Sequence, residues 1–227
     1  SVIARSAELG LDDGVRWDVS PGAYGNNSLG ADDGRGRATN PVTGLPYVPR
    51  SVARGDFGRA LTEYWMNGPR SETPPGHWNV LANAVSEDTA PLDALAWDVH
   101  LYLALNGALH DAAIAAWELK RRYSSSRPIT LIRYLGGLGQ RSDPEAAAYD
   151  PRGLPLVPGS IEPITEASSA PGERHAELRR YTGRIALRAW PGEPGDREAR
   201  AAGVRWVLAR DWVPYQPRSF VSPPYPG

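Results

Sequence analysis

Cysteine is missing from this chain of 227 residues, and methionine occurs once, as Met66. The absence of cysteine excludes disulfide bonds and zinc sites built on thiolates. A protein that makes an oxidant would benefit from having so little oxidisable sulfur, but compositional drift in an Arg-, Ala-, Gly- and Pro-rich chain explains the scarcity more simply. The net charge is −1, with neither a basic stripe nor an acidic tail. We therefore expect no nucleic-acid partner.

Long uninterrupted apolar runs are also missing, so we expect no membrane span. The most apolar segment, residues 91–123, is interrupted by polar side chains: Asp98, His100, Asn106, His110 and Asp111. No secretory signal is visible at the first residues. Residues 1–9 instead have the pattern of the end of a helix, with Gly10 as its C-cap. We therefore expect a chain that was cut or processed upstream, and a processed signal peptide is the competing explanation.

The remaining residues predict a mainly α protein with little β structure. Four helices are expected. The first spans 56–67, the second starts at its cap Thr73, the third spans 91–123, and the fourth runs from Pro128 to the Gly136-Gly137 pair. After these, we expect irregular chain at 141–172, a short strand at 185–190 and a short helix at 198–209. Gly and Pro together number 46, which predicts long ordered loops.

One partial domain is expected over residues 1–227. Its parts are loop-rich (10–52), helical (55–140), insert-like (141–205), and extended with a pocket-lining role (206–227). The aromatic residues of the last part are typical of core or pocket lining, and a partner-binding surface is the alternative.

The segment 91–123 is apolar over much of its circumference, which predicts a helix central to a core. Asn106, His110 and Asp111 are then expected to be partly buried, hydrogen-bonded polar groups rather than catalytic ones. His110 and Asp111 are neighbours in sequence, so we expect their side chains to diverge on a helix and to form no dyad.

Lysine is nearly absent as well, since Lys120 is the only lysine among the 25 basic residues. Ser124, Ser125 and Ser126 should end the helix that carries Lys120, and Pro128 should hold Arg127 extended at the start of the next helix. Two cationic side chains and a helix N-terminus would then meet at one point, which suits an oxyanion. A lysine near a helix C-terminus with an exposed arginine explains the same spacing, and both interpretations stay open here.

These residues resemble a known family. Lys120, six intervening residues and Arg127-Pro128 are similar to the first of three motifs shared by vanadium-dependent haloperoxidases and the related acid and lipid phosphatases. Trp117, one turn before the lysine, resembles a tryptophan that lines the vanadate pocket in the haloperoxidases. Residues 72–79 and 220–227 also resemble bacterial members. The resemblance implies a helical-bundle portion of a vanadium haloperoxidase-like fold.

The other two motifs of the family do not occur in this chain. There is no Ser-Gly-His, and none of the four histidines lies six positions after an arginine. We therefore expect no metal ligand within this chain, with the coordinating histidine and the rest of the catalytic domain beyond residue 227. The remaining part of the same protein, or a second chain, would complete the site, and this chain alone would be inactive.

The resemblance implies an enzyme that oxidises halide with hydrogen peroxide, with vanadate as cofactor and neither haem nor zinc. Lys120 and Arg127 would hold the vanadate, Lys120 would also be catalytic, and Trp117, Pro223 and Tyr225 would line the pocket. The other partner would be halide or a small organic substrate, and the resemblance favours a secreted or periplasmic location. An acid phosphatase of the same superfamily and a non-catalytic structural or interaction relative remain the alternatives.

Overall fold

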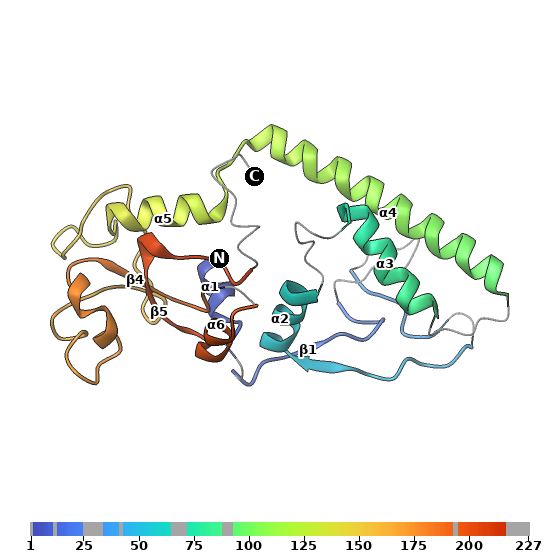
Figure 1. Cartoon of the computed structure of the whole chain (residues 1–227), viewed down its shortest axis with the longest axis horizontal. Helices are drawn as coiled ribbons and strands as arrows, with labels where there is room; N and C mark the ends of the chain where they lie inside the picture. The colour runs from blue at the N-terminus through green and yellow to red at the C-terminus, as the bar shows by residue number, and fades with distance from the viewer. Residues whose placement is uncertain are drawn as a thin grey trace.

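A computed structural model describes residues 2–10, 13–24, 34–40, 43–64, 72–87, 93–192 and 195–216. Figure 1 shows two regions joined at the middle of the molecule. The first, here the sheet region, contains α1, α5, α6 and β3 to β5. The second, here the helical arm, contains α3 and α4. In chain order the elements are α1 (Val2–Ala7), β1 (Arg16–Asp18), β2 (Ser51–Ala53), α2 (Arg54–Tyr64), α3 (Pro74–Glu87), α4 (Ala94–Tyr123), α5 (Pro128–Leu138), β3 (Ile161–Pro163), η1 (Ala176–Tyr181), β4 (Ile185–Ala189), α6 (Arg197–Ala202), β5 (Arg205–Leu208) and η2 (Ala209–Asp211).

The sheet region holds the main hydrophobic core. Strands β3, β4 and β5 form an antiparallel sheet in that order, with Leu187 of β4 opposite both Ile161 and Val207. Ala186 and Leu187 point to opposite faces of the sheet, and both are fully buried. One face packs on α5, α1 and Trp212, and the other packs on η1. A central strand covered on both faces therefore organises this region.

Helix α5 packs closely against η2, the turn that follows β5, because Gly136 has no side chain at the contact. A Cβ atom at Gly136 would lie 2.5 Å from the Cβ of Ala209, closer than two side chains can come. Arg133 Nε also donates to the carbonyl oxygen of Arg210 at 2.9 Å. The predicted end of this helix at the glycine pair is confirmed, since α5 ends at Leu138 with Gly139 as its cap.

Helix α2 packs against the sheet region. The hydroxyl of Tyr215 donates to Glu63 at 2.6 Å, and Arg59 lies 5.0 Å over the ring of Trp190. Burial raises the pKa of Tyr215 to about 12, and the hydrogen bond to Glu63 adds to this effect. At the other end of α2, Gly55 packs against the backbone of Gly10. These contacts attach α2 to the sheet region.

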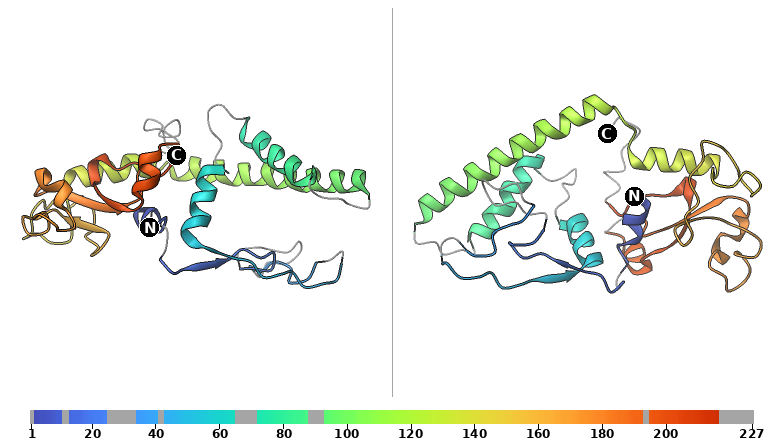
Figure 2. Two further views of the ribbon diagram at one scale, coloured as in Figure 1. Left: turned by 60° about the horizontal axis from the view of Figure 1, so that its bottom comes forward. Right: turned by 180° about the vertical axis from the view of Figure 1, so that it is seen from behind.

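The helical arm is held by polar contacts. Helices α3 and α4 lie side by side over the first half of α4 (Figures 1 and 2). Asn79 and Asn106 exchange two amide hydrogen bonds of 3.0 and 3.1 Å, and Ser86 donates to Asp98 at 3.1 Å. These hydrogen bonds are exposed, so each one replaces a hydrogen bond that water could make and adds little to stability.

The prediction that α4 is central to the core is wrong for the described part of the chain. The helix begins at its Asp93 cap and ends at Tyr123, close to the predicted bounds, but none of its residues is buried. Asn106, His110 and Asp111 are exposed, and His110 Nδ1 lies 3.2 Å from Asp111 Oδ1, so these two side chains do meet. The apolar content was recognised correctly, but the described residues do not supply a surface that covers it.

Helices account for most of the regular structure of the described residues, as predicted, together with two small sheets. The predicted strand at 185–190 is confirmed as β4. The prediction of one helix over 198–209 is only partly right, since α6 stops at Ala202 and residues 205–208 form β5. Every helix in the described ranges is too short or too polar to cross a membrane.

Candidate functional site: the α4–α5 junction

The last turn of α4 concentrates positive charge. Lys120, Arg121 and Arg122 lie in this turn, and Ser124 ends the helix in the left-handed conformation, with φ of 42°. The Ser124 N–H donates to the carbonyl oxygen of Lys120 at 2.9 Å. Cations near a helix C-terminus are stabilised by the helix dipole, so this position favours charged Lys120 whatever else it binds.

Lys120 and Trp117 form a pair on the surface of α4. The Nζ atom of Lys120 lies 4.8 Å from the centre of the Trp117 ring. The two residues are three apart, so the helix brings their side chains together. Trp117 is 69% exposed, which makes the interaction weak in water but leaves both groups open to a ligand. The predicted role of Trp117 as a pocket-lining residue stays a prediction.

Arg127 lies at the start of α5. Its backbone is extended, with φ of −58° and ψ of 144°, as the following Pro128 requires, and Pro128 occupies the first turn of the helix. Its side chain does not cap α5. Its Nε atom is buried and has no hydrogen-bond partner among the described residues. A buried guanidinium N–H without an acceptor is costly, so this atom is suited to donate a hydrogen bond to an anionic ligand.

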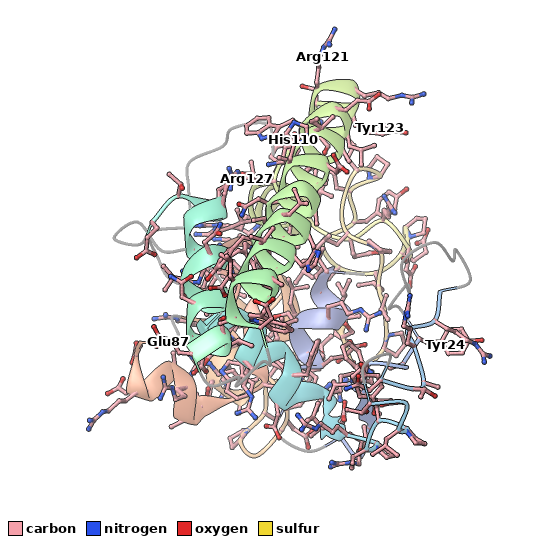
Figure 3. The ribbon with its side chains drawn as sticks, turned by 90° about the vertical axis from the view of Figure 1, so that its right-hand side faces the viewer. Tyr24, Glu87, His110, Arg121, Tyr123 and Arg127 are labelled. Carbon is pink, nitrogen blue, oxygen red and sulfur yellow. The ribbon has the colours of Figure 1, made fainter. Side chains whose placement is uncertain are left out.

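Lys120 and Arg127 lie on the two sides of the short connection between α4 and α5, here the α4–α5 junction. Figure 3 labels Arg121 and Tyr123 at the end of α4, where Arg121 projects away from the helix. Between Lys120 and Arg127 no hydrogen bond, ion pair or ring contact occurs in the described part of the chain. Pro223 and Tyr225, the other predicted pocket-lining residues, lie outside the described residues.

A buried histidine was missed by the interpretation of the sequence. His175 is fully buried, with Nδ1 2.9 Å from the Ser168 hydroxyl and Nε2 3.8 Å from Glu162. Its ring meets Trp206 edge-on, 4.5 Å between centres. Burial lowers the pKa of His175, although the charge of Glu162 acts in the opposite direction. The sequence offers no periodic pattern around residue 175 that would predict this cluster.

Chemistry at His175 is limited by burial. Ser168 is itself buried and accepts a hydrogen bond from the Thr165 N–H at 2.9 Å, so its hydroxyl faces the protein interior. Glu162 is held by Arg174 at 2.6 Å and by the Gly159 N–H at 2.6 Å. Burial raises the pKa of Glu162, but these hydrogen bonds outweigh it and leave the pKa lowered. The cluster is a structural network rather than a nucleophile.

A family model described as VCPO second helical-bundle domain matches residues 100–152. This range contains most of α4, the α4–α5 junction and all of α5, and it is less than a quarter of the chain. It supports a vanadium haloperoxidase-like relationship as a partial match. Neither the comparison with curated proteins nor the comparison with solved structures gave a match.

The residues at the junction fit an oxyanion better than a metal cation. No group of three or more His, Cys, Asp or Glu side chains suited to a metal ion occurs among the described residues. The junction instead presents donors, namely the buried Nε of Arg127 and the exposed ammonium of Lys120. Vanadate is an oxyanion, and donors of this kind are what its oxygens require.

Proposed function

We propose that this chain supplies part of the vanadate site of a haloperoxidase-type enzyme, with Lys120 and Arg127 as two of its oxyanion ligands. The observation that carries the proposal is the buried Nε of Arg127, which has no partner among the described residues although burial makes an unpaired donor costly. The family match over residues 100–152 supports the same conclusion because it spans both residues.

The two cations have different roles in this proposal. Arg127 presents a planar fork that can bind two oxygens at once, and its position beside Pro128 holds its backbone in one conformation. Lys120 is a point charge on a flexible stem, so it neutralises a further oxygen and can follow that oxygen as its charge grows. The helix N-terminus of α5 adds a positive potential beside Arg127.

Trp117 would set the environment of Lys120. Its ring lies beside the ammonium, limits the directions that the lysine can take, and offers an apolar wall to a bound substrate. Vanadate, when bound, would supply a Lewis acid that activates hydrogen peroxide toward halide. Groups outside this chain would contribute the coordinating histidine and the general acid, so we expect catalysis only from a completed site.

The test is the affinity of the full chain for vanadate, measured by isothermal titration calorimetry. Lys120→Ala should weaken binding about tenfold or more, since a hydrogen bond to a charged group contributes roughly 1.5–3 kcal/mol. Arg121→Ala is the matched control because it removes a cation from the same helical turn, and it should leave the affinity unchanged. Equal losses of vanadate affinity in the two variants would show that the anion is attracted by the net positive charge of this helical turn and not bound specifically by Lys120.

An acid phosphatase of the same superfamily is the alternative outcome. The same donors would hold a phosphoryl group, and vanadate would then act as an inhibitor that resembles the transition state. In a completed protein, phosphate-ester hydrolysis that vanadate inhibits, without bromide-dependent consumption of peroxide, would replace the haloperoxidase proposal. Absence of both activities together with absent vanadate binding would favour a non-catalytic relative.

A further inference from the structure

An apolar cavity lies next to the α4–α5 junction and is not used by the proposed oxyanion site. Its volume is about 510 Å³. Three segments far apart in sequence form its walls: residues 2–4 of α1, residues 126–135 at the start of α5, and residues 154–161 before and within β3. Ser126 and Pro128, the two neighbours of Arg127, belong to its lining. The cavity therefore begins one residue away from the proposed anion ligand.

The lining is apolar and lacks charge. Of the described residues that line the cavity, none carries a charged side chain, and only Ser126 and Ser160 carry hydroxyl groups. Its floor belongs to the hydrophobic core, through Ile132, Leu154 and Ile161. Water inside would find few hydrogen-bond partners, so replacing it with an apolar ligand is favourable.

The walls are held by the fold and do not depend on a ligand. The α1 wall is tied to the sheet by a hydrogen bond from the Trp190 N–H to the Ser6 carbonyl at 3.3 Å. The α5 wall is tied to η2 through Arg133, and the third wall is tied by the Leu154 N–H to the Gly139 carbonyl at 2.9 Å. A pocket formed in advance loses little entropy when a small molecule enters.

Apolar side chains remain half exposed at the rim. Val2, Leu131 and Val157 are 41%, 45% and 43% exposed, one from each wall. Covering them would remove apolar surface from water at about 25 cal/mol per Å². The volume falls within the range of roughly 300–1,000 Å³ that is usual for small-molecule sites. The concave shape made by three walls suits a compact molecule better than a flat protein surface.

We propose that this cavity binds a neutral apolar small molecule, aromatic or branched aliphatic, with at most one or two hydrogen-bonding groups for Ser126 and Ser160. The site goes beyond the proposed oxyanion function and does not depend on it. A ligand held there would lie beside the start of α5, so it is suited to bring an organic substrate close to Arg127.

The test uses N-phenyl-1-naphthylamine, a neutral apolar dye whose fluorescence rises in an apolar site, titrated into the full chain. We expect saturable binding of one dye per chain. Leu131→Glu and Val157→Glu place a carboxylate at the rim from two different walls. Each should weaken binding about tenfold or more, because the bound dye would cover that charge and remove it from water without a partner. Leu103→Glu, on the exposed surface of α4, is the control and should bind as the unaltered chain does.

Three results would overturn the proposal: no saturable dye binding, equal affinity in all three variants, or an unaltered chain that dimerises and is made monomeric by Leu131→Glu. The last result would identify the cavity as an interface between copies. The two rim variants lie on separate elements, so a folding failure of one leaves the other decisive. Vanadate affinity should be unchanged in Val157→Glu, which separates failure of the cavity from failure of the oxyanion site.

Discussion

The sheet region and the helical arm satisfy their apolar residues in different ways. In the sheet region, β4 is covered on both faces, and Leu187 and Trp190 are fully buried. In the helical arm, α4 is the longest helix of the described residues, yet none of its residues is buried, and its hydrogen bonds with α3 are exposed. The candidate site therefore lies at the boundary between a region whose core is closed and a helix that none of the described residues buries.

Truncating one leucine in each region should give the largest difference in the free energy of unfolding. Leu187→Ala should lower the free energy of unfolding by about 2–5 kcal/mol, because it opens a cavity in a closed core. Leu103→Ala lies on the exposed face of α4 and should change it by at most about 0.5 kcal/mol. Urea unfolding measures both. A large effect at Leu103 would mean that α4 is covered in solution, and the contrast between the regions would fail.

Two glycine-to-alanine substitutions, one in each region, should change stability in opposite directions. Gly136→Ala forces a methyl group against Ala209 and should destabilise the sheet region by about 1–3 kcal/mol. Gly107→Ala meets open space on α4 and should stabilise that helix by about 1 kcal/mol, since alanine favours the helix. Thermal unfolding followed by far-UV circular dichroism reports both changes. Destabilisation by Gly107→Ala would reveal a neighbour that the described residues do not include.

The attachment of α2 to the sheet region is tested at Tyr215. Tyr215→Phe removes the hydrogen bond to Glu63 and should cost about 1 kcal/mol, since Glu63 keeps Arg200 nearby as a partial partner. Tyr134→Phe removes a hydroxyl from an exposed tyrosine of α5 and is the control, with no expected change. The free energy of unfolding in urea is again the measurement. Equal free energies of unfolding for the two variants would show that the Tyr215–Glu63 hydrogen bond does not stabilise the attachment of α2.

The smallest expected effect is a pH dependence that belongs to the sheet region. Burial lowers the pKa of His175 below the ordinary histidine value of 6.5, so the unfolded chain binds the proton more readily than the folded one. The stability contributed by neutral His175 is therefore present above about pH 6.5 and is lost as the pH falls below it. His175→Gln should show a smaller fall in melting temperature on acidification.

The control for this prediction is His110→Gln, which alters an exposed histidine of α4. It should keep the acid dependence of the unaltered chain. The lowered pKa of Glu162 adds a loss of stability at more acidic pH, below the ordinary glutamate pKa of 4.5, so the two effects occur in different pH ranges. If His175→Gln and the unaltered chain lose stability equally between neutral pH and pH 5, the buried imidazole has no such role.

Local signals predicted the helix boundaries well. Thr73 caps α3 through the Gly76 N–H, Ser124 ends α4, and Pro128 begins α5, all at or near the expected positions. Each of these boundaries depends on the conformational preference of one residue and its immediate neighbours. The sequence is sufficient where local chemistry decides the structure.

Tertiary contacts decided the elements that the sequence did not predict. Residues 205–208 form a strand because they pair with β4, and nothing within so short a segment specifies that partner. The apolar content of α4 predicted burial, but composition cannot say whether the covering surface belongs to the described residues. The spacing of Lys120 and Arg127 pointed to the candidate site, whereas the unpaired Nε of Arg127 became visible only in the structure.

The assignment of Arg127 as an oxyanion ligand is tested most directly by comparing the vanadate affinity of Arg127→Lys with that of Arg121→Lys. Both variants keep the charge, but Arg127→Lys removes the buried Nε donor and the planar fork. We predict that Arg127→Lys weakens vanadate binding about tenfold or more, while Arg121→Lys binds as the unaltered chain does. Unchanged affinity in Arg127→Lys would contradict the assignment of Arg127 as an oxyanion ligand.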